Sequence, residues 1–145
     1  MIGSDITIRF VRPDRLMYEG KAHHVVLQTY KGEFAIYPGH APEIVALGDG
    51  VVRINRRPED GGDVYRILVS GGYAEVSDDT VIVLADHGRR MDDIDPVAAQ
   101  ETLERTEQRL AELDPSDHRS AYYENKLNWC KLLLKYAPKE PGPQA

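Results

Sequence analysis

Residues 5–86 consist of short apolar stretches separated by turn-forming residues, and this pattern constrains the fold more than any other feature. Ile6, Ile8 and Phe10 alternate with less apolar neighbours, as in a half-buried strand. Clusters such as 48–50 and 58–63, rich in glycine and aspartate, separate such stretches. Because no crossover helix interrupts them, we expect antiparallel pairing and no parallel sheet. The sequence therefore predicts an N-terminal antiparallel β-sandwich over residues 1–88.

The pattern changes after residue 88, where residues 89–93 form a charged segment that we expect to be a linker. Asp95-Pro96 combines an N-cap residue with a first-turn proline, which favours a helix start. From there, apolar residues recur every three or four positions on either side of Asp114-Pro115. The two stripes are Ala99, Leu103, Thr106, Leu110, Leu113 and Tyr123, Leu127, Cys130, Leu134, Ala137. They predict an α+β protein with a C-terminal antiparallel two-helix hairpin over 94–137 and a disordered tail at 138–145.

Composition narrows the classes of function. The net charge of −6 and the pI of about 5.3 disfavour nucleic acid as a partner. Cys130 is the only cysteine, so no internal disulfide forms, and we expect a small buried side chain there. No apolar run approaches the ~20 residues that span a bilayer. A role at a membrane would therefore depend on another protein.

Residues 32–42 predict a rigid, exposed corner. Pro38 fixes φ and lacks a backbone donor, and Gly39 supplies the conformational freedom of a tight reversal. His40 lies between two prolines on this corner. Loops that are held by a rigid scaffold often carry function, so we expect the corner to contact a ligand or a partner.

Catalytic motifs are absent from the sequence. Metal ligands on one strand face are spaced by two, whereas His23 and His24 are adjacent and should point to opposite faces. The sequence contains no G-x-S-x-G elbow, no P-loop and no G-x-G-x-x-G motif. We therefore predict no catalytic residue, no metal ligand and no cofactor. Two alternatives stay open: a small metal-dependent β-sandwich enzyme and a free-standing interaction module.

Three blocks of residues follow one another in the first two-thirds of the chain. They are VRPDRLMYEG at 11–20, GEFAIYPGHAP at 32–42, and SGGYAEV at 70–76 followed by TVIVLAD at 80–86. In order and spacing they resemble blocks of the epsilon subunit family of F-type ATP synthases, called delta in mitochondria. The last third of the chain is similar to the family in helical character more than in residues.

The resemblance implies a non-catalytic subunit of the central stalk. It would join the gamma subunit to the c-ring, rotate with them, and couple proton or sodium ion flow to ATP synthesis. It would be peripheral, at the cytoplasmic face of the bacterial plasma membrane. The resemblance also places Gly32, Glu33 and His40 at the c-ring. From the residues alone, Glu33 is equally an ordinary exposed carboxylate, and the His40 side chain is best explained as a cap for its own turn.

The second helical segment carries more apolar surface than a hairpin needs. At 100° per residue, Tyr122, Trp129, Leu133 and Tyr136 form a face beside the stripe that meets the first helix. This face either packs on the sandwich or docks on another subunit. The resemblance implies that the hairpin can extend along gamma toward the alpha and beta catalytic subunits and inhibit ATP hydrolysis.

The start of the hairpin resembles the ATP-sensing motif of the family. Ile94, Asp95 and Ala99 match it, but Ala98 stands at the arginine position. Because the arginine would supply a cation for nucleotide phosphates, its loss leaves ATP only as a weak regulatory ligand. The second helix offers lysines at 126 and 131, which bind phosphate as point charges. The alternative is that Asp95 is only an N-cap.

Overall fold

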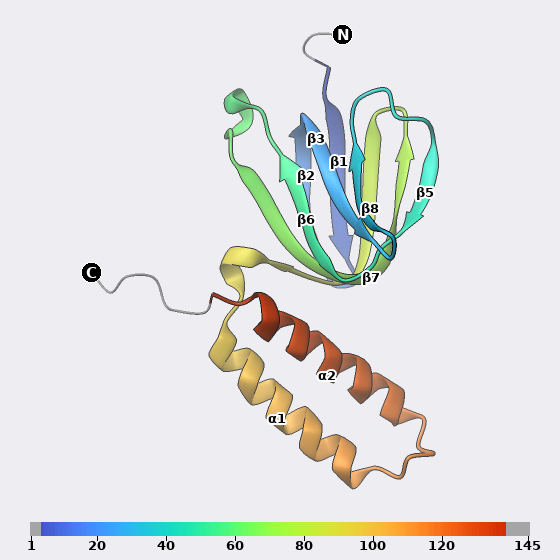
Figure 1. Ribbon diagram of the computed structural model, residues 1–145, viewed down its shortest axis with the longest axis vertical. Helices are drawn as coiled ribbons and strands as arrows, with labels where there is room; N and C mark the ends of the chain where they lie inside the picture. The colour runs from blue at the N-terminus through green and yellow to red at the C-terminus, as the bar shows by residue number, and fades with distance from the viewer. Residues whose placement is uncertain (1–3, 139–145) are drawn as a thin grey trace, which may run out of the picture. The chain divides into compact units, whose positions relative to one another are not determined.

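A computed structural model describes residues 4–138, apart from the side chain of Asp60. The chain divides into two compact units at Arg90 and Met91 (Figure 1). The first unit is built of strands and the second of helices, which confirms the predicted α+β class. The boundary lies two residues beyond the predicted end of the sandwich.

Within residues 4–138, the strands of the first unit belong to one hydrogen-bonded sheet of 8 strands. The sheet order is β2-β1-β8-β7-β6-β3-β4, and β5 pairs with β7. The bounds are β1 Ile6–Arg12, β2 Arg15–Ala22, β3 His24–Thr29, β4 Gly32–Ile36, β5 Glu43–Ala46, β6 Gly50–Asn55, β7 Val64–Ser77 and β8 Thr80–Arg90, with the 3₁₀ helix η1 at Pro58–Asp60.

A bend in β7 divides this sheet into the two layers of a sandwich (Figure 1). Before the bend β7 pairs with β6, and after it β7 pairs with β5. Gly71 and Gly72 form the bend with φ of +73° and +110°, values that favour glycine. A Cβ at Gly72 would lie 2.0 Å from the carbonyl oxygen of Leu84 on β8, so this position also needs glycine for space.

The pair formed by β1 and β8 is parallel, which corrects the expectation of purely antiparallel pairing. Its register runs from Thr7 opposite Thr80 to Val11 opposite Leu84. Parallel neighbours need a long connection, and the chain from β2 to β7 supplies it. The prediction considered only consecutive stretches, whereas this pair joins the first and last strands of the unit. The other described pairs are antiparallel.

The core of the sandwich lies between the two layers. Ile6, Ile8 and Phe10 of β1 are fully buried, which confirms the alternation seen in the sequence. They belong to one cluster with apolar side chains of β3, β4, β6, β7 and β8. Burial of each such side chain contributes about 1.5–3 kcal/mol, so this unit has the core that a rigid body requires.

The segment 89–93, predicted to be a linker, is regular structure. Arg89 and Arg90 continue β8 and pair with Leu68 and Ile67 of β7. The 3₁₀ helix η2 (Met91–Asp93) follows directly. The linker prediction rested on the charge of these residues, but strand pairing uses backbone groups and tolerates exposed charged side chains.

Helices α1 (Pro96–Glu112) and α2 (Arg119–Tyr136) form the predicted antiparallel hairpin (Figure 1). Asp95 is the N-cap of α1 and accepts hydrogen bonds from the backbone N–H groups of Val97 and Ala98. Most side chains of the two predicted stripes are buried or half-buried, with Ala99, Thr106, Cys130 and Ala137 buried. Of the predicted tail 138–145, residues 139–145 lie outside the described residues.

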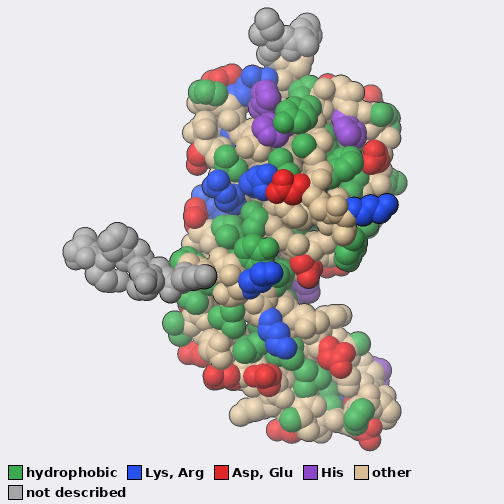
Figure 2. Space-filling view, viewed as in Figure 1, with side chains coloured by type: hydrophobic (Ala, Val, Ile, Leu, Met, Phe, Trp, Pro, Cys, Tyr) green, Lys and Arg blue, Asp and Glu red, His purple; other side chains and the backbone are tan. Residues whose placement is uncertain are grey.

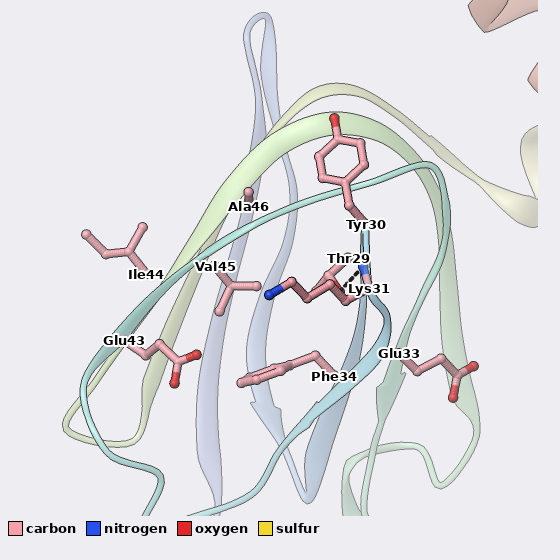
Figure 3. Close-up of a pocket in the computed structure, with 9 residues that line it drawn as sticks. All are labelled: Thr29, Tyr30, Lys31, Glu33, Phe34, Glu43, Ile44, Val45 and Ala46. Atoms are coloured by element: carbon pink, nitrogen blue, oxygen red, sulfur yellow. Dashed lines mark hydrogen bonds between the residues drawn. The ribbon is translucent and has the colours of Figure 1, made fainter.

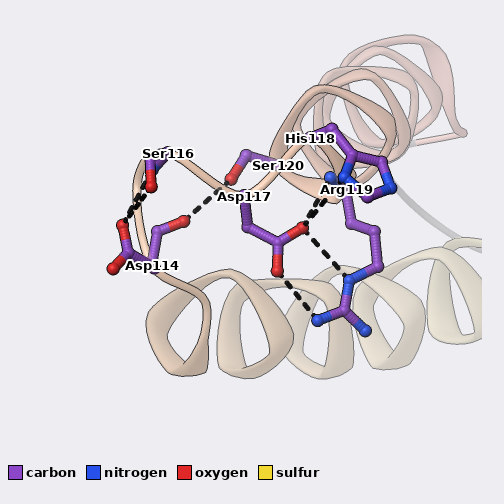
Figure 4. A network of polar contacts seen from close by, with 6 residues as sticks. All are labelled: Asp114, Ser116, Asp117, His118, Arg119 and Ser120. Atoms are coloured by element: carbon purple, nitrogen blue, oxygen red, sulfur yellow. Dashed lines mark hydrogen bonds and ion pairs between the residues drawn. The ribbon is translucent and has the colours of Figure 1, made fainter.

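The turn between the helices is held by two aspartates (Figure 4). Asp114 accepts hydrogen bonds from the backbone N–H and the hydroxyl of Ser116. Asp117 accepts from the backbone N–H of Arg119, at the start of α2, and from its guanidinium. These bonds lower the pKa of Asp117 to about 2. The backbone N–H that Asp117 satisfies belongs to the first residue of α2.

Candidate subunit-contact surfaces

The predicted corner leaves β4 and is tied to a distant part of the sandwich. The backbone N–H of His40 donates to the carbonyl of Tyr37 over 3.2 Å, which closes the turn. The backbone N–H of Gly39 donates to Oδ1 of Asp79, in the turn between β7 and β8, over 2.7 Å. Gly39 has a φ of +88°. The corner is therefore fixed at both its turn and its far side, as a rigid contact surface requires.

Glu33 is exposed at the start of β4, next to Gly32, and its carboxylate is already paired. Nη1 of Arg53, on β6, lies 2.8 Å from Oε1 of Glu33. Because β3 lies between β4 and β6, this ion pair spans three strands. The hydrogen bond from Arg53 is the main cause of the lowered pKa of Glu33. A basic group of a partner would therefore compete with Arg53 for this carboxylate.

His40 is half-buried, and its side chain contacts the sandwich and not its own turn. Nε2 of His40 lies 3.5 Å from Oε1 of Glu43 on β5. The ring meets Phe34 of β4 edge-on, with the centroids 5.4 Å apart. The ring thus links the strands on either side of the corner. Of the three residues predicted to meet the c-ring, Gly32 and Glu33 lie at the start of β4 and His40 lies beyond its end.

A cavity of about 450 Å³ lies between β5 and the β3–β4 hairpin (Figure 3). The Lys31 side chain extends across it toward Val45, with Phe34 beside them, while Glu33 points the other way (Figure 3). Two large hydrophobic side chains lie at its rim, Tyr30 with 81% and Ile44 with 71% of their area exposed. This surface cannot be predicted from the sequence pattern, because it forms only when β5 pairs with β7.

His23 and His24 are brought together, contrary to the expectation that they point apart. Nδ1 of His23 lies 2.8 Å from Nδ1 of His24. His23 occupies a bend between β2 and β3, so the alternation of a continuous strand does not apply to it. Histidine side chains are visible on the surface of the sandwich in Figure 2. Among residues 4–138, no group of three or more His, Cys, Asp or Glu side chains is arranged to hold a metal ion.

The predicted apolar face of α2 is unevenly exposed. Leu133 is 5% exposed and Tyr122 is 62% exposed, while Trp129 and Tyr136 are half-buried. The ring of Tyr122 meets that of Tyr123 edge-on at 5.1 Å. Tyr122 therefore offers the most free area for a partner among these four residues. No described helix combines the length and the apolar character that crossing a membrane requires.

The three residues of the predicted nucleotide motif do not form a pocket. Ile94 and Ala99 are buried, and Oδ1 of Asp95 accepts the two N-cap hydrogen bonds. These observations agree with the alternative in which Asp95 is an N-cap. The motif therefore offers no cation to a phosphate group.

Cationic side chains gather elsewhere in the hairpin, around a cavity of about 230 Å³. Arg105 and Arg109 of α1 and Lys126 of α2 line it. Thr102, Thr106 and Tyr123 complete the lining, although the hydroxyl of Thr106 donates to the carbonyl of Thr102. Lys126 was predicted as a possible phosphate ligand and the two arginines were not, although their spacing of four residues places them on one face of α1.

Both units of the chain are similar to known proteins. Residues 5–90 match the family model described as ATP synthase, Delta/Epsilon chain, beta-sandwich domain. An ATP synthase epsilon chain of Microcystis aeruginosa is 36% identical over 131 residues, which cover 90% of this chain and 92% of the relative. One of Leptospira borgpetersenii is 34% identical over 120 residues, covering 83% and 88%.

Solved structures share the fold. A chain of the Euglena gracilis mitochondrial ATP synthase (OSCP/F1/c-ring) aligns with a TM-score of 0.65 and 21% identity, over 92% of this chain and 81% of that one. A chain of the Tetrahymena thermophila mitochondrial ATP synthase (central stalk and c-ring) aligns with a TM-score of 0.59 and 14% identity, over 93% and 98%.

The fold thus defines a class of small protein in which a β-sandwich is followed by a helical hairpin. The family model covers more than half of the chain, and the bacterial relatives extend over both units. The chain belongs to the ATP synthase delta/epsilon chain family.

Proposed function

We propose that this chain is a rotor subunit of the central stalk of an F-type ATP synthase, and that it couples proton flow to ATP synthesis. The observation that carries the proposal is the 36% identity to an ATP synthase epsilon chain over 131 residues, which include parts of both units. In this role the chain catalyses no reaction. It joins the gamma subunit to the c-ring and is held through the complex at the cytoplasmic face of the bacterial plasma membrane.

The structure of the sandwich supports a role in transmitting torque. Its strands form one continuous hydrogen-bonded sheet around a fully buried core. The corner at residues 37–40 is tied to Asp79 and is therefore part of this rigid body. Close-packed interiors have low compressibility, so a force applied at one edge is transmitted to the other.

We assign the c-ring contact to Gly32, Glu33 and His40. Glu33 is exposed and charged, and a basic group of the ring would replace Arg53 as its partner. Glu33→Gln should weaken assembly of the chain with the membrane sector, and the effect should shrink at high salt. The matched control is Glu59→Gln, at an exposed carboxylate of η1. If both variants assemble equally well, the assignment of Glu33 to the c-ring contact is wrong.

We assign hairpin contacts with the gamma, alpha and beta subunits to Tyr122, Trp129, Leu133 and Tyr136. In an extended state these side chains would pack on the new partners and block ATP hydrolysis. Moving an equilibrium from mostly retracted to mostly extended takes a differential binding energy of about 5.5 kcal/mol. Deletion of residues 94–145 should raise ATP hydrolysis by the complex while assembly is kept. Unchanged hydrolysis would reject the inhibitory role.

We propose ATP as a weak regulatory ligand of the hairpin. Ile94, Asp95 and Ala99 would lie near ATP, but its phosphates need cations, and Arg105, Arg109 and Lys126 line the cavity of the hairpin. Calorimetric titration of ATP into the chain tests this, with Arg105→Gln plus Arg109→Gln as the informative variant. Binding weaker than about millimolar in the natural chain would reject ATP as a ligand.

Co-purification tests the proposed function as a whole. A chain with an affinity tag should retain the gamma subunit and the c-ring when the complex is extracted in mild detergent. A free-standing interaction module would bring down other proteins. Recovery of the tagged chain without gamma would contradict the rotor role.

A further inference from the structure

Two histidines of the sandwich share a hydrogen bond between their rings. Nδ1 of His23 lies 2.8 Å from Nδ1 of His24, and a bond between these atoms requires a proton on one and a lone pair on the other. The backbone holds the pair in place, because the N–H of His23 donates to the carbonyl of Asn55 over 2.8 Å and His24 pairs with Asn55 in the sheet. The contact therefore exists only while at least one of the two rings is neutral.

Tyr37 links this pair to the corner at residues 37–40. Its ring stacks on His24, with the centroids 4.6 Å apart and an angle of 14° between the planes, and meets His23 edge-on at 6.0 Å and 90°. The carbonyl of Tyr37 accepts the hydrogen bond from the backbone N–H of His40 that closes the turn. The corner is therefore fastened on one side through Tyr37 to the two imidazoles, and on the far side through Gly39 to Asp79.

The surroundings of the pair disfavour a positive charge on it. Beside His24, β6 presents Asn55 and, two residues away on the same face of the sheet, Arg53, which is paired with Glu33 of β4. Burial is the main cause of the lowered pKa of His24, and the charges of His23 and Arg53 lower it further. The ring of His24 is therefore neutral at neutral pH, and the hydrogen bond of the pair is intact.

We propose that the pair of His23 and His24 is a proton-sensitive latch, which fastens the 37–40 corner at neutral pH and releases it at acidic pH. When both rings are protonated, each Nδ1 is a donor, so no lone pair remains between them and the two positive charges repel each other. One ring must then turn away. His23 is the exposed member and lies on a bend, so its ring leaves, and Tyr37 loses its edge-on contact. This inference rests on the geometry of the pair and is independent of the rotor role.

The lowered pKa of His24 sets the direction of the pH dependence. A histidine of the unfolded chain titrates near about pH 6.5, so between that value and the lower pKa of the folded chain the unfolded chain binds more protons. The contribution of the latch to stability is therefore complete above about pH 6.5 and is lost as the pH falls through the lower pKa of His24. The corner should loosen in the same range.

Nuclear magnetic resonance of the histidine ring nitrogens in the full chain tests the hydrogen bond without any substitution. At about pH 8, one ring of the pair should carry its proton on Nδ1 and the other should have an unprotonated Nδ1 that accepts. As the pH falls, the backbone N–H signals of Gly39 and His40 should shift with the same midpoint as the ring of His24. Two rings that both have unprotonated Nδ1 atoms at high pH would overturn the proposal.

Substitutions separate the latch from the histidine of the corner itself. His40 lies 3.5 Å from Glu43 and is also ionisable, so the variants are compared in the His40→Gln background. There, the protection factor of the backbone N–H of residue 40 against hydrogen exchange should fall about two- to tenfold between about pH 7.5 and pH 5, the equivalent of one hydrogen bond.

His24→Phe keeps an aromatic ring for Tyr37 to stack on and should remove this pH dependence. The matched control is His118→Asn, at a histidine of the hairpin turn whose side chain is 96% exposed, which should leave the pH dependence unchanged. A pH dependence of the same size in the double variant H24F/H40Q would show that other groups control the corner and would also overturn the proposal.

Discussion

Replacement of Gly72 by alanine tests the bend in β7 on which the two layers depend. A Cβ at this position would lie 2.0 Å from the carbonyl oxygen of Leu84 and 2.9 Å from Cα of Ala85. Contacts below 3.0 Å do not occur for real Cβ atoms, so β7 and β8 must separate by about 1 Å at this point. The φ of +110° adds a conformational cost of about 1–3 kcal/mol for alanine.

Separation of β7 and β8 also breaks backbone hydrogen bonds between them, and this loss adds to the conformational cost of the substitution. Each backbone hydrogen bond contributes about 0.5–1.5 kcal/mol, and a buried group left without a partner costs about 1–3 kcal/mol. With the conformational cost, Gly72→Ala should lower the free energy of unfolding by roughly 3–6 kcal/mol, a large part of the stability of a typical domain.

Gly39→Ala is the matched control for this experiment. Gly39 has a φ of +88°, but nothing lies within 4 Å of the position of its Cβ. Its cost should be about 1–2 kcal/mol, from conformation alone. The gain from a less flexible unfolded chain is the same in both variants and cancels in the comparison. Urea unfolding followed by far-ultraviolet circular dichroism measures both. A Gly72→Ala variant no less stable than Gly39→Ala would refute the argument from the bend.

Three further predictions concern the hairpin turn, the apolar face of α2 and the core. The pKa of Asp117 is lowered to about 2 in the folded chain, so its contribution to stability is complete above about pH 4 and is lost as the pH falls toward 2. Fluorescence of Trp129, the single tryptophan, should report unfolding in that pH range. In the Asp117→Asn variant, stability should depend less on pH over the same range. By the same probe, Leu133→Ala should lower the free energy of unfolding by about 2–5 kcal/mol, because Leu133 is buried. Tyr122→Ala should change it by no more than about 0.5 kcal/mol, because Tyr122 is exposed. Equal costs of the two substitutions would contradict the described burial. Phe10→Ala should cost about 3–5 kcal/mol in thermal unfolding of the sandwich, and a loss below 1 kcal/mol would contradict its place in the core.

Local patterns in the sequence were sufficient for the elements and their class. The alternation at Ile6, Ile8 and Phe10 marked a buried strand face, and the cap at Asp95 marked the start of α1. Both signals act over a few residues, and tertiary contacts do not alter them. The spacing of apolar residues likewise indicated which helix faces meet.

Features that depend on sheet order could not be predicted in this way. The ion pair of Glu33 and Arg53 forms across β3, so it requires knowledge that β3 lies between β4 and β6. The parallel pairing of β1 and β8 joins stretches about 70 residues apart, for which alternation carries no information. His23 and His24 converge because the chain bends before β3, and alternation within a strand suggested the opposite.

The contribution of this chain to coupling is tested most directly by ATP synthesis in inverted membrane vesicles. Vesicles from cells that lack the chain would be energised with a proton gradient, with and without added purified protein. We predict little synthesis without it, and recovery with either the full chain or residues 1–93. Undiminished synthesis in its absence would contradict the account of the sandwich as the coupling element.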